Sequence, residues 1–122
     1  ARDGEIIVGR EQQTFENGYD AMKQLLQEKK ATACFVAENP MAQGVFKCLM
    51  DYKKRIPEEM AMICYDDFEW SQLTVPTISA IRQPMKEMGR KAVELLLKKI
   101  GDPDARCENI ILKSEFILRE SC

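Results

Sequence analysis

The fold of this chain is decided by the stretch Met60-Ala61-Met62-Ile63-Cys64-Tyr65, which Asp66 and Asp67 follow directly. Six mostly apolar residues in a row are typical of a strand buried on both faces. In an open parallel sheet, ligands bind in the crevice beyond the carboxyl ends of the strands. The two aspartates are therefore the first candidates for function, although such a pair also forms ordinary solvated turns and helix N-caps.

Two strand–helix units precede this central stretch. Residues 5–8 form a short apolar run, and residues 33–37 form a longer one. Between them, Thr14 can cap a helix whose apolar face recurs with helical spacing at Phe15, Tyr19, Met22 and Leu26. Asn39 and Pro40 predict a second helix, with Asn39 as its N-cap and Pro40 at its first position. Residues 5–65 thus read as strand, helix, strand, helix, strand, which predicts a parallel sheet with right-handed crossovers.

The rest of the chain supplies one more helix and two extended segments. Residues 75–81 read as extended chain closed by Pro84, and an apolar face recurs along residues 85–100 before Gly101. Residues 111–118 alternate with period two, which indicates a half-exposed or edge strand. Together with the upstream units, this predicts an α/β fold in which helices cover both faces of an open parallel sheet.

Polar residues follow each predicted strand of the first half of the chain. Gln13 comes after the first strand, Glu38 and Asn39 after the second, and Asp66 after the third. The carboxyl ends of parallel strands share one edge of a sheet, so these side chains are expected to converge. Amide and carboxylate groups bind hydroxyls in pairs, as recognition of a polyhydroxylated ligand requires.

Composition excludes several classes of protein. The 122 residues suit a single domain, and 18 basic against 20 acidic residues leave no electrostatic footprint for nucleic acid. No apolar run is long enough for a membrane span, and nothing at the N-terminus resembles a signal peptide. Five irregularly spaced cysteines without any histidine do not fit a structural zinc site. A reduced, cytoplasmic setting fits best.

An enzyme is not expected. General acid–base and nucleophilic mechanisms usually need a base that titrates near neutral pH, and the chain has no histidine. It carries no phosphate-binding or nucleotide-binding glycine motif and no nucleophile elbow. One catalytic alternative remains: Asp66, Asp67 and Glu38 holding Mg²⁺ as in receiver domains, which however carry their acidic pair after the first strand. No metal or other cofactor is otherwise expected.

The order of several short motifs resembles the C-terminal part of the LacI/GalR family of bacterial transcription regulators. The motifs are Ala37-Glu38-Asn39-Pro40-Met41-Ala42-Gln43-Gly44, Ile56-Pro57-Glu58, Tyr65-Asp66-Asp67, Pro76-Thr77-Ile78-Ser79-Ala80-Ile81-Arg82-Gln83-Pro84, Gly89 with Ala92, Leu96 and Leu97, and Arg119-Glu120-Ser121. The effector domain of that family resembles periplasmic sugar-binding proteins, with two α/β lobes around a cleft. The resemblance implies that residues 1–122 are the C-terminal part of such a domain: residues 5–80 the C-terminal lobe, residues 81–108 a helix packing on the other lobe, and residues 109–122 a returning strand.

The resemblance also implies roles for single residues. Asp66 matches the family aspartate that binds effector hydroxyls, and Glu38 and Asn39 align with the family's Asn-Asp pair at the cleft. Gln13 falls where several members place a ring-stacking aromatic residue. Trp70 either supplies an aromatic face instead or simply packs the crossover. Cys64 replaces the family's usual glycine, so the turn at Asp66 is expected to differ locally.

For the whole protein, the resemblance implies a homodimer that binds DNA through an upstream region absent from this chain. A small-molecule effector such as a sugar would alter operator affinity through different contacts in two states. A periplasmic sugar binder of a transport system is the alternative, and it would require a signal peptide upstream. The same resemblance implies that an upstream strand and most of the other lobe are missing, so strand edges and one apolar helix face should be exposed.

Overall fold

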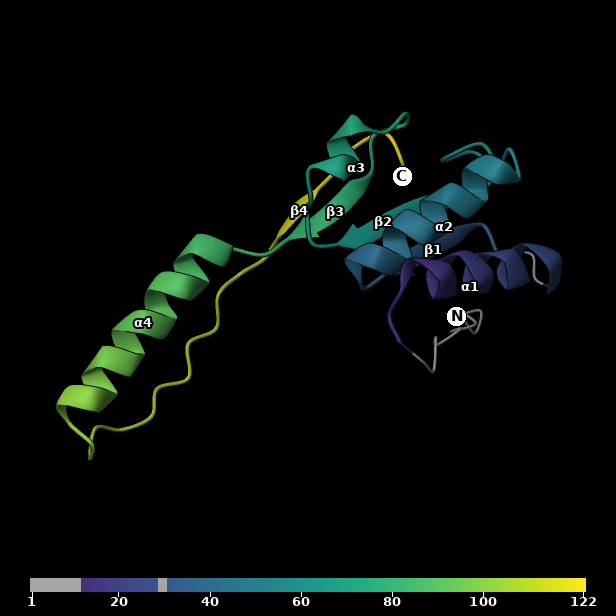
Figure 1. The fold of residues 1–122 in the computed structure, drawn as a ribbon. Helices are drawn as coiled ribbons and strands as arrows, with labels where there is room; N and C mark the ends of the chain where they lie inside the picture. Colours follow the sequence, from purple (N-terminus) through teal and green to yellow (C-terminus); the bar gives the residue numbers. More distant parts are fainter. Residues whose placement is uncertain (1–11, 29–30) are drawn as a thin grey trace, which may run out of the picture.

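The computed structural model describes residues 12–28 and 31–122, so the strand predicted over residues 5–8 lies outside the described part. The α/β fold predicted from the sequence is confirmed (Figure 1). The elements, in chain order, are α1 (Phe15–Glu28), β1 (Ala33–Val36), α2 (Asn39–Asp51), β2 (Ala61–Tyr65), α3 (Trp70–Leu73), β3 (Ser79–Arg82), α4 (Met85–Gly101) and β4 (Glu115–Ile117).

The described strands form one four-stranded sheet in the order β1-β2-β3-β4. β1 pairs with β2 in parallel, as predicted, with Cys34 opposite Met62. β2 also pairs in parallel with β3, with Cys64 opposite Ala80, where the sequence predicted only extended chain. β4 is antiparallel to β3, so the sheet is mixed rather than wholly parallel. This difference arises because the chain leaves β3 through α4 and returns along the edge of the sheet in the opposite direction. The period-two pattern of residues 111–118 yields only the short strand β4.

Within the described residues, helices α1 and α2 cover one face of the sheet. The buried core joins Met22 of α1 and Leu49 of α2 to Met62 and Cys64 of β2. On the opposite face, Phe35 is 56% exposed and its ring meets that of Tyr65 edge-on, with the ring centres 6.5 Å apart. The strand order does not reverse from β1 to β3, and right-handed crossovers along one direction fall on the same side. Helices on both faces, as the sequence predicted, are therefore not found in this part of the chain.

Helices α1 and α2 pack closely against each other at two glycines, Gly18 and Gly44. A Cβ atom on Gly44 would lie 2.0 Å from the carbonyl oxygen of Phe15, and one on Gly18 would lie 2.2 Å from that of Met41. Both distances are far below van der Waals contact, so only glycine permits this approach. The beginnings of α1 and α2 consequently lie side by side at the same end of the sheet (Figure 1).

Helix α4 projects away from the rest of the molecule (Figure 1). None of its residues is buried; Leu96 is 60% exposed and Ile100 is 68% exposed. Residues 102–114 run back beside the helix before β4 rejoins the sheet. The predicted amphipathic helix is therefore present, with its apolar side uncovered.

The end of the chain is joined to the middle of the sheet. The backbone N–H of Met62 donates to the carbonyl oxygen of Ser121 at 2.9 Å, and the Ser121 hydroxyl donates to the carbonyl oxygen of Met62 at 2.6 Å. The same hydroxyl accepts the backbone N–H of Ser79 at 2.8 Å. These bonds hold the segment after β4 against β2 and β3.

Candidate functional site

The carboxyl ends of β1, β2 and β3 meet at one edge of the sheet, because the three strands are parallel. Asn39 begins the helix that follows β1, Asp66 follows β2 and Gln83 follows β3. Two of these residues, Asn39 and Asp66, belong to the group predicted from the sequence. We refer to the side chains of Asn39, Asp66 and Gln83 as the polar edge.

Asp66 stands at the centre of the polar edge in an unusual backbone conformation. Its φ is 67°, in the left-handed region, which aspartate tolerates better than most residues. The backbone N–H of Asp66 donates to the carbonyl oxygen of Ile81 at 2.9 Å, which extends the pairing of β2 with β3 by one bond. Its Oδ1 accepts the side-chain amide of Gln83 at 2.7 Å. The turn therefore forms without the glycine usual in the related family, and it keeps the carboxylate half-buried at the edge.

Asp67, the second aspartate, turns inward and forms ion pairs. Its side chain is 1% exposed and accepts hydrogen bonds from Arg119, Arg82 and the Ser71 hydroxyl. The guanidinium of Arg119, and to a smaller extent that of Arg82, lowers the pKa of the Asp67 carboxyl from 3.8 to about 2, although burial opposes this shift. The two adjacent aspartates therefore differ: Asp67 stabilises the fold through its ion pairs, whereas the carboxylate of Asp66 lies at the edge of the sheet.

Asn39 and Trp70 are in direct contact. The indole Nε1–H of Trp70 donates to Oδ1 of Asn39 at 2.6 Å, and the Trp70 ring packs on Phe46 with a centroid distance of 6.2 Å. The predicted N-cap at Asn39 is wrong: Glu38 occupies that position without a side-chain cap, and Asn39 is the first helical residue. The Asn39 side chain is bound by Trp70, so it does not close the helix end.

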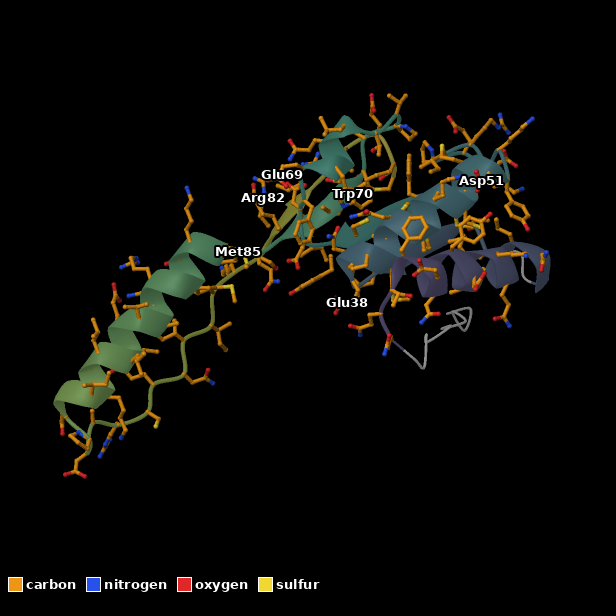
Figure 2. All side chains as sticks on the ribbon, in the orientation of Figure 1. Glu38, Asp51, Glu69, Trp70, Arg82 and Met85 are labelled. Carbon is orange, nitrogen blue, oxygen red and sulfur yellow. The ribbon has the colours of Figure 1, made fainter. Side chains whose placement is uncertain are left out.

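The other two predicted residues are exposed. Glu38 lies at the beginning of α2, on the side away from Trp70 in Figure 2. Gln13 lies just before α1, and the adjoining beginnings of α1 and α2 bring it to the same end of the sheet. The structure joins Asn39 to Trp70 and Asp66 to Gln83, while Glu38 and Gln13 stand apart from these two pairs.

Two cavities open beside the polar edge. The smaller, of about 120 Å³, is lined by Asp66, Asp67, Phe68, Arg82, Gln83 and Met85. The larger, of about 430 Å³, lies between Tyr65, Gln83 and α4 on one side and residues 108–114 on the other. Gln83 borders both, so a ligand in the larger cavity would meet the partner of Asp66.

The described residues do not favour a metal centre. Within residues 12–28 and 31–122, no three His, Cys, Asp or Glu side chains are grouped to hold an ion. The Arg119 guanidinium already lies 2.7 Å from Oδ1 and 2.9 Å from Oδ2 of Asp67, which opposes the receiver-like alternative. Burial raises the pKa of the thiols of Cys34 and Cys64 to about 12, as expected for small core residues. No helix in this part of the chain is both long and apolar enough to span a bilayer.

Sequence reasoning missed the residues that follow β3. Gln83 and Arg82 stand at the carboxyl end of the third parallel strand, the position that identified Asp66 after β2. Applying the same rule to residues 79–82 would have found them. No local pattern points to Arg119, which lies 52 residues from Asp67 in the sequence.

Comparison with known proteins identifies relatives over almost the whole chain. A family model described as periplasmic binding protein-like domain matches residues 3–122. The ribose operon repressor of Haemophilus influenzae is 34% identical over 108 residues, which are 88% of this chain and 32% of the repressor. The transcriptional repressor PurR of the same species is 36% identical over 110 residues, 87% of this chain and 33% of PurR.

The fold has close counterparts among solved structures. A LacI family transcriptional regulator from Enterococcus faecium with bound ribose aligns with a TM-score of 0.83 and 30% identity, covering 94% of this chain and 42% of the regulator. This chain therefore spans about a third of the length of the curated repressors and less than half of that structure.

Proposed function

This chain belongs to the family of periplasmic binding protein-like domains, as part of a LacI/GalR-type effector-binding domain, and we propose that it senses a small polar effector for a transcription repressor. The observation that carries the proposal is the position of Asp66. Its half-buried carboxylate stands at the carboxyl end of a central parallel strand, beside a cavity and hydrogen-bonded to Gln83. Ligands of open α/β sheets bind at this position.

The chemistry of the polar edge suits a sugar or a similar polyhydroxylated molecule. Asp66 accepts hydrogen bonds, while Asn39 and Gln83 carry both donors and acceptors. A hydroxyl group donates and accepts at once, so it can satisfy such neighbours in pairs. The cavity of about 430 Å³, which of the polar-edge residues only Gln83 lines, falls within the range of small-molecule sites, about 300–1,000 Å³. We assign Asp66, Asn39 and Gln83 to direct effector contact, with Glu38 and Gln13 at the rim.

The exposed part of the chain fits the second lobe of the effector domain. The apolar side of α4 and the extended residues 102–114 have no cover from the described helices and strands. We infer that residues 81–108 pack on the other lobe, and that residues 109–122 return to the first. The effector would then bind between the lobes, with the sheet edge as one wall.

The relatives guide the proposal for the whole protein. They are transcription repressors, which favours a regulator over an enzyme or a transport binder. We propose a cytoplasmic homodimer whose DNA contacts come from another region of the protein. Effector binding alters operator affinity only if it stabilises one of two conformations over the other.

Calorimetry on the full-length protein tests the role of Asp66. A panel of pentoses, hexoses and disaccharides, beginning with D-ribose and cellobiose, is first screened by shifts in melting temperature. Asp66→Asn keeps the size of the side chain but removes the charged acceptor. It should weaken binding of the active sugar by roughly 10- to 150-fold, because a charge-assisted hydrogen bond contributes about 1.5–3 kcal/mol.

Glu69→Gln is the matched control, since Glu69 is an exposed acid three residues from Asp66 and makes the same change of charge. It should leave the affinity unchanged. Equal affinities of Asp66→Asn and wild type would remove Asp66 from the site. Failure of every sugar in the panel to bind would reject the proposed class of effector.

A further inference from the structure

Trp70 uses its indole N–H and its ring for contacts inside the protein. The N–H donates to Asn39 at 2.6 Å across 31 residues of sequence, and the ring is inclined at 53° to that of Phe46, both rings being partly buried against the core. Trp70 is half-buried and is the first residue of α3, with its ring against Phe46 of α2 (Figure 2). These contacts leave Trp70 poorly suited to stack on a ligand.

The hydrogen bond from the Trp70 indole determines the orientation of the Asn39 side-chain amide. An indole nitrogen only donates, so Asn39 must present its oxygen to Trp70. The side-chain amide of Gln43 donates to the same oxygen at 3.4 Å. Both interactions fix the amide so that its NH₂ group faces away from the indole.

The NH₂ group of Asn39 is open to solvent. In residues 12–28 and 31–122, every buried side-chain nitrogen or oxygen has a hydrogen-bond partner. Among the described residues no acceptor is found for Nδ2 of Asn39, so this atom is not fully enclosed. The polar edge thus presents two free donors at Asn39 and a carboxylate at Asp66.

We propose that Trp70 is a positioning residue, which fixes the amide of Asn39 with its two N–H donors directed at the effector. The inference rests on the proposed function, in which the effector binds at the polar edge. It adds a rule of specificity: the group bound by Asn39 must be a hydrogen-bond acceptor, such as a hydroxyl or ring oxygen. An ammonium group has no acceptor, so an amino sugar with its ammonium at this position is rejected.

Trp70→Phe separates the indole N–H from the bulk of the ring. Phenylalanine keeps an aromatic side chain against Phe46 but donates nothing to Asn39, so the amide is free to turn over. In the full-length protein, binding of D-ribose measured by calorimetry should weaken by about three- to tenfold, as for one neutral hydrogen bond. Asn39→Ala removes the donors themselves and should weaken binding at least as much.

A double-mutant cycle distinguishes positioning from general support of the fold. If Trp70 acts through Asn39, then Trp70→Phe in the Asn39→Ala background causes no further loss of ribose affinity. If the two losses multiply, Trp70 acts by another route and the proposal is overturned. Asn39→Asp sharpens the comparison, because its carboxylate still accepts the indole N–H but offers no donor. It should bind ribose as weakly as Asn39→Ala.

A second measurement needs no ligand. The exchange rate of the Trp70 indole proton, followed by NMR on the full-length protein, should be slow in the wild type and in Asn39→Asp. It should be fast in Asn39→Ala, while Gln43→Ala serves as the control that leaves it slow. Fast exchange in the wild type would overturn the proposal. If the wild type binds neither ribose nor any other sugar of the panel, the proposed function fails, whereas slow indole exchange that depends on Asn39 still supports the fixed amide.

Discussion

Arg119 contacts both carboxylate oxygens of Asp67: Nη2 donates a hydrogen bond to Oδ2 at 2.9 Å, and Nη1 forms an ion-pair contact with Oδ1 at 2.7 Å. Nη1 also donates to the carbonyl oxygen of Ile78 at 2.6 Å. Arg82 adds a further pair of bonds to Oδ2 of Asp67, from Nε at 3.0 Å and Nη2 at 2.5 Å. The turn after β2 is thereby tied to the end of β3 and to the segment that follows β4.

Asp67→Asn should destabilise the folded protein substantially. The Arg119 side chain is only 13% exposed, so the variant leaves a largely buried guanidinium without its carboxylate. We expect a loss of about 3 kcal/mol in the free energy of unfolding, as for a broken buried pair. Arg82→Gln is the matched control: Arg82 is 48% exposed, and its loss should cost below about 1 kcal/mol. Urea unfolding followed by circular dichroism measures both, and similar losses would contradict the distinction between the two arginines.

Acid should remove the stabilisation that Asp67 provides. The pKa of its carboxyl is lowered to about 2 in the folded protein, so between pH 4 and pH 2 the unfolded chain binds the proton more readily. The contribution of the Asp67 ion pairs to the free energy of unfolding is complete above the ordinary pKa near 4 and disappears as the pH falls toward 2. Its full size is about 2 kcal/mol. The free energies of unfolding of the wild type and Asp67→Asn should therefore differ less near pH 3 than near pH 6. A difference that does not change with pH would argue against this titration.

Gly44→Ala should force α1 and α2 apart. Its new methyl group would lie 2.0 Å from a backbone carbonyl of α1, which no side-chain rotation relieves. A loss of about 1–3 kcal/mol is expected from such overpacking. Gly89→Ala is the control within α4, where nothing lies within 4 Å of the added methyl; it should stabilise by about 0.5–1 kcal/mol because alanine favours the helix. Thermal melting of both variants tests the opposite signs.

The 122-residue chain on its own should associate. Val93, Leu96, Leu97 and Ile100 form an exposed apolar stripe on α4 at helical spacing. Replacing Leu96 and Ile100 with glutamate should reduce association in light scattering over a dilution series. Lys86→Gln together with Lys91→Gln lowers the net charge of α4 by the same two units outside the stripe and serves as the control. A wild-type chain that stays monomeric at high concentration would reject this prediction.

Local sequence patterns predicted most of the elements. The apolar runs at residues 33–37 and 60–65 correspond to Ala33–Val36 and Ala61–Tyr65, and the helical spacing of residues 85–100 corresponds to Met85–Gly101. Each of these signals depends on neighbours within a few residues. The short helix α3 was not predicted, because four residues are too few to show a period.

Long-range pairs decided what the sequence left open. The pattern could not tell which of two adjacent aspartates faces the edge, since that depends on Arg119, which reaches Asp67 from the segment after β4. The hydrogen bond from the indole of Trp70 to Asn39 is likewise not predictable from spacing. The predicted cap at Asn39 was wrong because the helix begins at Asn39 itself, with Glu38 in the cap position. Such pairs follow from the register of the sheet and not from spacing along the chain.

Helix α4 projects from the sheet beside the ion pairs that Asp67 forms with Arg82 and Arg119, so any tilt of the helix would be centred there. Arg82 bonds to Asp67 at the point where the chain leaves for α4, and its Nη1 lies 3.7 Å from Glu115, where the chain returns. A helix of 17 residues is about 25 Å long, so a rotation of about 10° at Arg82 would carry its Gly101 end by roughly 4 Å. The end of α4 next to Asp66 can therefore tilt only slightly, within the bonds of Asp67, and still move the far end of the helix. That movement exceeds the width of a water molecule.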